Sequence, residues 1–285
     1  MILSMTGFGR SEGIFEGKKI VAEIKSLNSK NFDLGIRIPA RYKEKEFEIR
    51  KLLNDRILRG KVDCYLNIEF LEGAGAATIN QDIVKAYVEQ LKACAGDGPD
   101  YEYLQMALRF PDATSVQPDV LDEAEFAFLL KTVEEALDKF QNFRATEGQI
   151  LHEELSRNIQ NIQKNLEKVV PFEEVRMDAV KERYQKTLSE FQNIDETRFY
   201  QEMAYYTEKL DISEEKVRLA QHLSYYEDVM QNETFNGKKL GFIAQEIGRE
   251  INTLGSKANQ ADIQKLVVEM KDDLEKIKEQ TLNVL

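Results

Sequence analysis

The spacing of apolar residues changes once along this chain of 285 residues, and that change limits the folds open to it. In residues 20–24, 32–38 and 62–70, apolar side chains alternate with polar or charged ones. From about residue 121 they recur every three or four residues, most regularly at Ile263, Val267, Met270, Leu274 and Ile277. Period two is typical of half-buried strands, and spacings of three and four are typical of helices. The sequence therefore predicts an α+β protein.

The N-terminal part is predicted to be an antiparallel sheet with flanking helices. Pro39 ends the second strand, and a helix is expected between that proline and Gly60. Asn80 is the expected N-cap of a further helix that runs to about Ala95. A break at residues 96–99 precedes a short helix at 101–110. We place an N-terminal α+β domain at residues 1–155.

The remainder is predicted to consist of long α-helices in hairpins. Their apolar seams are narrow and flanked by charged residues, so one helix cannot bury its own seam. Such helices pair within the chain or between chains, and we therefore expect a homo-oligomer. We place a helical hairpin connector at residues 156–205 and a C-terminal helical domain, which carries the presumed active site, at residues 206–285.

The net charge of −12 argues against a simple basic nucleic-acid-binding domain. Residues 1–61, however, carry +6 and the rest of the chain −18. This asymmetry suggests that the N-terminal part meets a polyanion, although it fits equally a contact with the acidic helices inside one assembly. There is no transmembrane-length apolar run and no secretory signal, and Cys64 and Cys94 suit two reduced thiols. We expect a cytoplasmic protein with no membrane partner.

The polar face of residues 236–257 is the strongest candidate for a functional site. Glu246 and Glu250 lie one helical turn apart and can share a divalent cation, which prefers oxygen ligands. The nearby donors Arg249, Asn252 and Lys257 suit phosphate oxygens. The same pattern also fits a buried polar network that fixes helix packing.

Histidine is scarce, which bears on any chemistry at a phosphodiester. A site with paired histidines would need both His152 and His222, from distant helices. Carboxylates that hold Mg²⁺ or Mn²⁺ are therefore the favoured route. Asp211 and Glu214 are further candidate ligands, although their spacing also fits a capping box at a helix start.

Several segments resemble, in order, the motifs of the YicC/YloC family of bacterial endoribonucleases. They are residues 4–10 (SMTGFGR), 23–28 (EIKSLN), 59–62 (RGKV), 144–148 (RATEG), 210–215 (LDISEE) and 249–257 (REINTLGSK). The resemblance runs from end to end and departs at Gly248, where a bulkier polar residue is expected. It implies an N-terminal α+β domain, a C-terminal helical domain, a ring-like hexamer and divalent-metal-dependent cleavage of RNA.

The leading hypothesis is a metal-dependent endoribonuclease that acts on single-stranded or small regulatory RNA. Its catalytic residues would be Glu246, Glu250, Arg249, His222 and Lys257. The divalent cation, Mn²⁺ or Mg²⁺, would be held among Glu246, Glu250, Asp211, Glu214 and His222.

The RNA backbone would be bound by basic and amide side chains, with steep salt dependence. The candidates are Lys25, Asn28, Lys30, Arg37, Arg41, Lys238, Lys239 and Asn252. Two other hypotheses remain. One is a non-catalytic RNA-binding adaptor that delivers small RNAs to another nuclease, and the other is a purely structural helical oligomer.

Overall fold

The computed structural model describes residues 2–29, 31–71, 78–96, 98–115, 122–190 and 196–285. The chain divides into two compact units. The sheet unit comprises Phe8–Lys25 and Phe32–Phe140, and the helical unit comprises Met1–Gly7, Ser26–Asn31 and Gln141–Leu285. The division at 140/141 falls within one helix, α4 (Glu123–Glu190), as does residue 155, where the sequence placed the end of the first domain.

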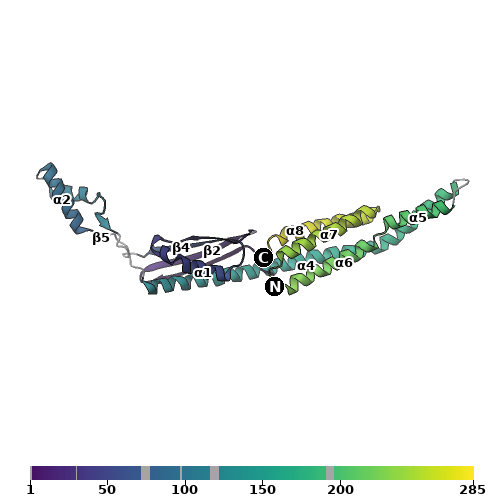
Figure 1. Cartoon of the computed structure of the whole chain (residues 1–285), viewed down its shortest axis with the longest axis horizontal. Coiled ribbons are helices and arrows are strands. Elements are labelled where there is room, and N and C mark those ends of the chain that lie inside the picture. The colour runs from purple at the N-terminus through teal and green to yellow at the C-terminus, as the bar shows by residue number, and fades with distance from the viewer. Residues whose placement is uncertain (1, 30, 72–77, 97, 116–121, 191–195) are drawn as a thin grey trace. The chain divides into compact units, whose positions relative to one another are not determined.

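The sheet unit is built on four strands in the order β1-β2-β4-β3. Their bounds are Gly7–Phe15 for β1, Lys18–Leu27 for β2, Asp33–Arg37 for β3 and Lys61–Phe70 for β4. The α+β class is confirmed, but the predicted antiparallel sheet is wrong because β3 and β4 run parallel, from Asp33 opposite Lys61 to Arg37 opposite Tyr65. The helices η1 (Ala40–Lys45) and α1 (Glu46–Arg56) cross between these two strands and so permit the same direction. Figure 1 shows α1 beside the sheet.

The core of the sheet unit follows the predicted alternation. Ile20, Ala22 and Ile24 of β2 and Val62 and Cys64 of β4 are buried against α1 and the first part of α4. Burial raises the pKa of the Cys64 thiol to about 12, which keeps this thiol protonated and unreactive. Cys94 is exposed, and both cysteines are free.

Strand β1 was not predicted, because its inward-facing residues are small instead of apolar. Gly9 and Ser11 are buried on the same side as α4. A Cβ atom on Gly9 would lie 2.0 Å from the carbonyl oxygen of Ala136 and 2.5 Å from the amide nitrogen of Phe140. The close approach of β1 to α4 therefore requires glycine, and a strand of this kind carries no apolar alternation.

Residues after β4 form a small element group with its own core. Strands β5 (Thr78–Ile79) and β6 (Thr114–Ser115) pair antiparallel. Helix α2 (Gln81–Ala95) begins after Asn80 as predicted, and α3 (Asp100–Ala107) is the expected short helix. Val84, Ala107 and Ala113 are buried together.

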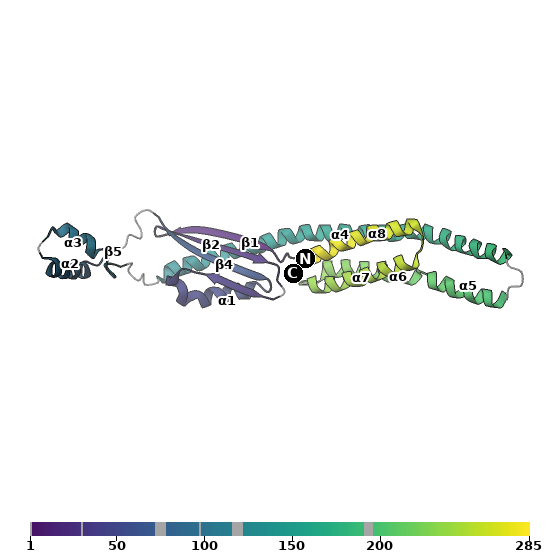
Figure 2. The same ribbon diagram turned by 90° about the horizontal axis from the view of Figure 1, so that it is seen from above.

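The helical unit contains the later part of α4 and four further helices. These are α5 (Glu196–Leu210), α6 (Ser213–Asn232), α7 (Gly237–Lys257) and α8 (Ala261–Thr281). Helix α7 packs against both α6 and α8, and both views show the three beside α4 (Figures 1 and 2). The apolar seam of α8 is buried in the core that these helices share. That seam is therefore covered within one chain and does not by itself require a second copy. Among the described residues, no helix has the length and apolar character that a membrane span needs.

The two ends of the chain meet in the helical unit, and both views show them together (Figures 1 and 2). The Leu285 amide donates to the Leu3 carbonyl at 2.9 Å, and the Met5 amide donates to the Asn283 carbonyl at 2.8 Å. Arg144 of α4 donates from Nε to the Ser4 carbonyl at 2.6 Å, and its burial lowers the pKa of this guanidinium to about 10. The motifs at residues 4–10 and 144–148 thus make structural contacts with each other.

Gly9→Ala is expected to destabilise the sheet unit by about 1–3 kcal/mol, because the added methyl group overlaps the backbone of α4. The measurement is the urea-unfolding midpoint followed by circular dichroism. The matched control is Gly241→Ala in α7, where a Cβ meets nothing within 4 Å and helix propensity should add stability. Equal midpoints for Gly9→Ala and wild type would contradict the close packing of β1 on α4.

Candidate functional site

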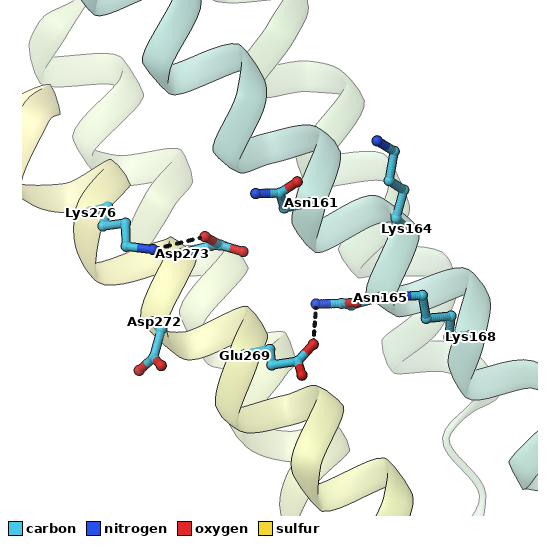
Figure 3. A pocket seen from close by; sticks show the side chains of 8 residues that line it. All are labelled: Asn161, Lys164, Asn165, Lys168, Glu269, Asp272, Asp273 and Lys276. Atoms are coloured by element: carbon cyan, nitrogen blue, oxygen red, sulfur yellow. Dashed lines mark hydrogen bonds and ion pairs between the residues drawn. The ribbon is translucent and has the colours of Figure 1, made fainter.

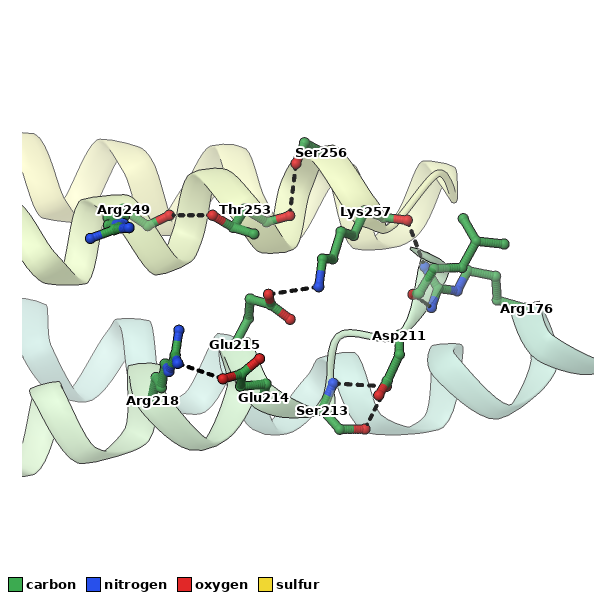
Figure 4. Close-up of polar contacts among 11 residues, drawn as sticks. Arg176, Asp211, Ser213, Glu214, Glu215, Arg218, Arg249, Thr253, Ser256 and Lys257 are labelled. Atoms are coloured by element: carbon green, nitrogen blue, oxygen red, sulfur yellow. Dashed lines mark hydrogen bonds and ion pairs between the residues drawn. The ribbon is translucent and has the colours of Figure 1, made fainter. Parts of the chain in front are cut away.

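The start of α6 lies beside the end of α7, and an ion pair joins the two helices there (Figure 4). Lys257 Nζ lies 2.8 Å from Glu215 Oε1. The Glu215 side chain is only 6% exposed, whereas that of Lys257 is 30% exposed. The other carboxylate oxygen, Glu215 Oε2, is buried with no hydrogen-bond partner among the described residues. The ammonium of Lys257 is thus held by a carboxylate that is itself shielded from solvent.

Arg176 of α4 fixes the backbone at the same place (Figure 4). Its guanidinium donates to the carbonyl of Lys257 at 3.0 Å and to the carbonyl of Leu210, at the end of α5, at 2.7 Å. Burial lowers the pKa of Arg176, and the charges of Glu173 and Asp211 oppose that effect. Lys257 is therefore anchored through its side chain by Glu215 and through its carbonyl by Arg176.

Asp211 and Glu214 act at the start of α6 in different ways. Asp211 Oδ1 accepts hydrogen bonds from the Ser213 amide at 3.0 Å and the Ser213 hydroxyl at 2.7 Å. These bonds lower the pKa of Asp211, with a further contribution from the charge of Lys257. Glu214 is exposed and pairs with Arg218 at 2.5 Å. The predicted capping box is therefore wrong: the N-cap of α6 is Ile212, Asp211 accepts from the first amide of the helix, and Glu214 pairs with Arg218 instead.

The two carboxylates of α7 differ in exposure. The Glu246 side chain is half exposed and lies 3.9 Å from Arg249, which is 74% exposed. Glu250 is buried, because it continues the apolar stripe of Ile243 and Ile247 towards Leu254. Asn252 is exposed on α7, and His222 is partly exposed on α6. One face of α7 thus presents a carboxylate and a guanidinium to solvent, one turn from a buried carboxylate.

The predicted metal ligands do not form a complete coordination site among the described residues of one chain. Among the described residues, no three side chains of His, Cys, Asp or Glu gather closely enough to hold an ion. The set of Glu246, Glu250, Asp211, Glu214 and His222 is therefore not brought together. Of the two carboxylates of α7, only Glu246 is open to solvent, and Mg²⁺ held by one or two carboxylates takes its other ligands from water and phosphate.

The predicted RNA-binding residues of the N-terminal part fall into three groups. Lys25 and Arg37 are exposed, with Lys25 Nζ 5.6 Å from the centroid of the Phe8 ring and Arg37 5.1 Å from that of Tyr65. Arg41 pairs with the buried Glu125 at 2.7 Å, and Asn28 donates to the carbonyl of Leu282 at 2.6 Å, so both make structural contacts. Lys30 lies outside the described residues.

Gly248, where the sequence departs from the expected pattern, lies at the contact of α7 with α8. A Cβ at this position would be 3.1 Å from Leu274 Cδ2. This is closer than an ordinary van der Waals contact, so the Leu274 side chain would have to shift by a few tenths of an ångström to admit a larger residue. The small size of Gly248 thus fits the close packing of α7 on α8.

A separate polar hollow of about 330 Å³ lies between α4 and α8 (Figure 3). Its lining alternates in charge: Lys276 Nζ lies 3.2 Å from Asp273, and Asn165 donates to Glu269 at 3.1 Å. None of the predicted site residues lines it. Because its charges are mutually compensated, it has no excess of one sign that would select phosphate or a cation.

Sequence reasoning missed Arg176 and did not single out Glu215. Both lie on apolar helix stripes: Arg176 follows Val169 and Phe172 at spacings of three and four, and Glu215 lies between Ile212 and Leu219 in the same way. A charged residue on a buried stripe must find a partner. That position was the signal that could have identified both residues.

Comparisons with known proteins identify the family of the chain. Residues 2–153 match the family model for the N-terminal region of YicC-like endoribonucleases, and residues 162–285 match the model for their C-terminal part. Two relatives named "Probable endoribonuclease YicC", from Clostridioides difficile and Haemophilus influenzae, are each 32% identical to this chain over the full length of both proteins. The chain belongs to the YicC-like endoribonuclease family.

Lys257→Met is expected to destabilise the helical unit by about 3 kcal/mol, because it leaves the buried Glu215 carboxylate unpaired. Glu215→Gln should cost less, since the Lys257 ammonium can reach water. The double variant should recover most of the loss. The measurement is a double-mutant cycle of unfolding free energies.

The matched control for this cycle is Lys265→Met, which breaks an exposed pair with Asp262 at 3.2 Å and should change stability by less than about 0.5 kcal/mol. Additive effects of the Glu215 and Lys257 changes would show that the two side chains are not coupled.

Proposed function

We propose that the protein is an endoribonuclease that hydrolyses RNA phosphodiester bonds with the help of Mn²⁺ or Mg²⁺. Family membership over the whole chain supports the activity. The observation that supports the location is the exposed face of α7, where Glu246 and Arg249 lie together one turn from Glu250. Carboxylates for a hard cation and a guanidinium for phosphate are the two components that such a reaction needs.

Each residue of this site has a proposed role. Glu246 and Glu250 would hold the cation, which when bound supplies a water of lowered pKa and neutralises charge on the phosphate. Arg249 donates hydrogen bonds to the non-bridging phosphate oxygens, for which its exposed planar guanidinium is suited. Lys257 places a fixed positive charge at the end of α7, and His222 would act from α6, where its side chain is partly exposed. Asn252 and Lys238 extend the RNA contact along the exposed face of α7.

The wider setting is also part of the proposal. The resemblance supports a hexamer in the cytoplasm that cuts single-stranded or small regulatory RNA, with Lys25 and Arg37 as further backbone contacts. Sedimentation velocity of the pure protein at micromolar concentration tests the assembly. A monomer at micromolar concentration would contradict it.

Metal dependence is tested with end-labelled single-stranded RNA and the pure protein. Cleavage should be lost in EDTA and restored by excess Mn²⁺, because the proposed ligands are hard oxygen donors. Cleavage that persists at full rate in EDTA would rule out the metal mechanism.

The carboxylate assignment is tested with Glu246→Gln/Glu250→Gln, which should lower the cleavage rate by about 100-fold or more while RNA binding is retained. The matched control is Glu275→Gln/Glu279→Gln, a pair of exposed glutamates with the same spacing on α8. Circular dichroism checks that both variants fold. Unchanged cleavage by the α7 variant would overturn the assignment, and RNA that is bound but uncut by the wild-type protein would favour the adaptor.

A further inference from the structure

An exposed patch of aromatic and basic side chains lies where α7 begins. We define the aromatic–lysine patch as Tyr225 of α6 with Lys238, Lys239 and Phe242 of α7. The rings of Tyr225 and Phe242 are 44% and 57% exposed. Exposed rings leave flat apolar area in water, and such area is a surface on which an unpaired base can stack.

Contacts within the patch hold the lysines over the rings. Lys239 Nζ lies 5.1 Å from the centroid of the Tyr225 ring, and Lys238 Nζ lies 5.9 Å from that of Phe242. Glu233 bonds to the same Lys239 ammonium at 2.5 Å and raises its pKa, so the lysine stays charged. Because residues three and four apart share a helix face, Phe242 lies on the same side as both lysines.

A hollow adjoins the Tyr225 ring. It has a volume of about 670 Å³ and is lined by Val217, Ala220, Gln221, Ser224, Tyr225 and Asp228. Apolar side chains and hydrogen-bonding groups are both present, as in sites that take small planar ligands. A nucleobase next to Tyr225 would find an apolar surface for its face and polar groups for its edge.

Lys238 and the N-terminal amides of α7 supply positive charge at this place, whereas the charge of Lys239 is balanced by Glu233. The first turn of α7 contains Lys238 and Lys239 and no acidic residue. The amides of that turn add the positive end of the helix dipole. Phosphates are therefore attracted to the point where the two rings are exposed.

We propose that the aromatic–lysine patch binds single-stranded RNA, with unpaired bases stacked on Tyr225 and Phe242 and the adjacent phosphates paired with Lys238 and Lys239. Stacking on exposed aromatic rings beside lysines is the usual way in which proteins hold single strands without reading sequence. A duplex cannot bind in this way, because its base faces are covered by their neighbours. The proposal rests on the proposed RNA substrate and adds that the RNA is unpaired where it meets α6 and α7.

The chain contains no tryptophan, so a single introduced tryptophan reports on one place. Phe242→Trp and Tyr225→Trp are titrated in EDTA, in which the proposed mechanism allows no cleavage, with an oligoribonucleotide as a single strand and as a duplex of the same sequence. The single strand should quench the emission of both variants, and the duplex should not. Phe47→Trp, at a 75% exposed ring on α1, is the control and should not change.

Affinity measurements give a second readout. Phe242→Ala should weaken single-strand binding about tenfold. Lys238→Gln/Lys239→Gln should lower the slope of log affinity against log salt by about 1.4, since each phosphate contact on a single strand contributes about 0.7. The control is Lys265→Gln/Lys271→Gln on α8, which should leave the slope unchanged.

The outcomes separate this proposal from the proposed function. RNA that binds in a filter assay without any change in emission at positions 225 and 242 would overturn the patch alone. Absence of all RNA binding at low salt would overturn both. Emission that is blue-shifted without RNA and shifts back on dilution would show that a second copy of the chain covers the patch, and would also overturn the proposal.

Discussion

Helix α4 contributes apolar side chains to two separate hydrophobic cores. Leu129, Val133 and Leu137 are buried in the sheet unit, and Leu155 and Ile159 are buried in the helical unit. Neither core is complete without these side chains, and burying each one stabilises the fold by about 1.5–3 kcal/mol. The sequence of α4 is therefore constrained along most of its length, including positions where a glycine of β1 or the terminal segment approaches its backbone.

Some charged residues occupy positions that helix packing would normally fill with apolar side chains. Arg176, Glu215 and Glu250 each lie on a buried stripe of the helical unit. Removing such charges from water is costly unless they are paired, and an apolar replacement often packs as well. The contacts of Glu215 and Arg176 with Lys257 offset this cost. The same two contacts hold the end of α7 from two sides. Rigid placement of the groups on α7 is a requirement for a site that must position a phosphate.

The two ends of α7 have different surroundings, and this suits an elongated ligand. The end of the helix holds Lys257 in a buried ion pair, its middle exposes Glu246 and Arg249, and its start exposes Phe242 beside two lysines. A single strand that follows the exposed face of α7 would thus meet stacking surfaces before it meets carboxylates. Acidic residues elsewhere on the chain would limit non-specific retention of RNA away from this face.

The sequence by itself determined the α+β class, the positions of most helices and strands, and the family, because period-two and period-3.6 patterns and long motifs are local properties of the chain. It did not determine the direction of β3 against β4 or the presence of β1, since the first depends on a crossover through α1 and the second on the close approach of a strand to α4. It identified Glu246 and Arg249 as neighbours because they share one helix. Only the tertiary structure decided that Glu215 and Arg176 fix Lys257, that Glu250 is buried, and that Tyr225 joins the lysines of α7. These contacts join different helices, and no spacing along the chain specifies which helix faces meet.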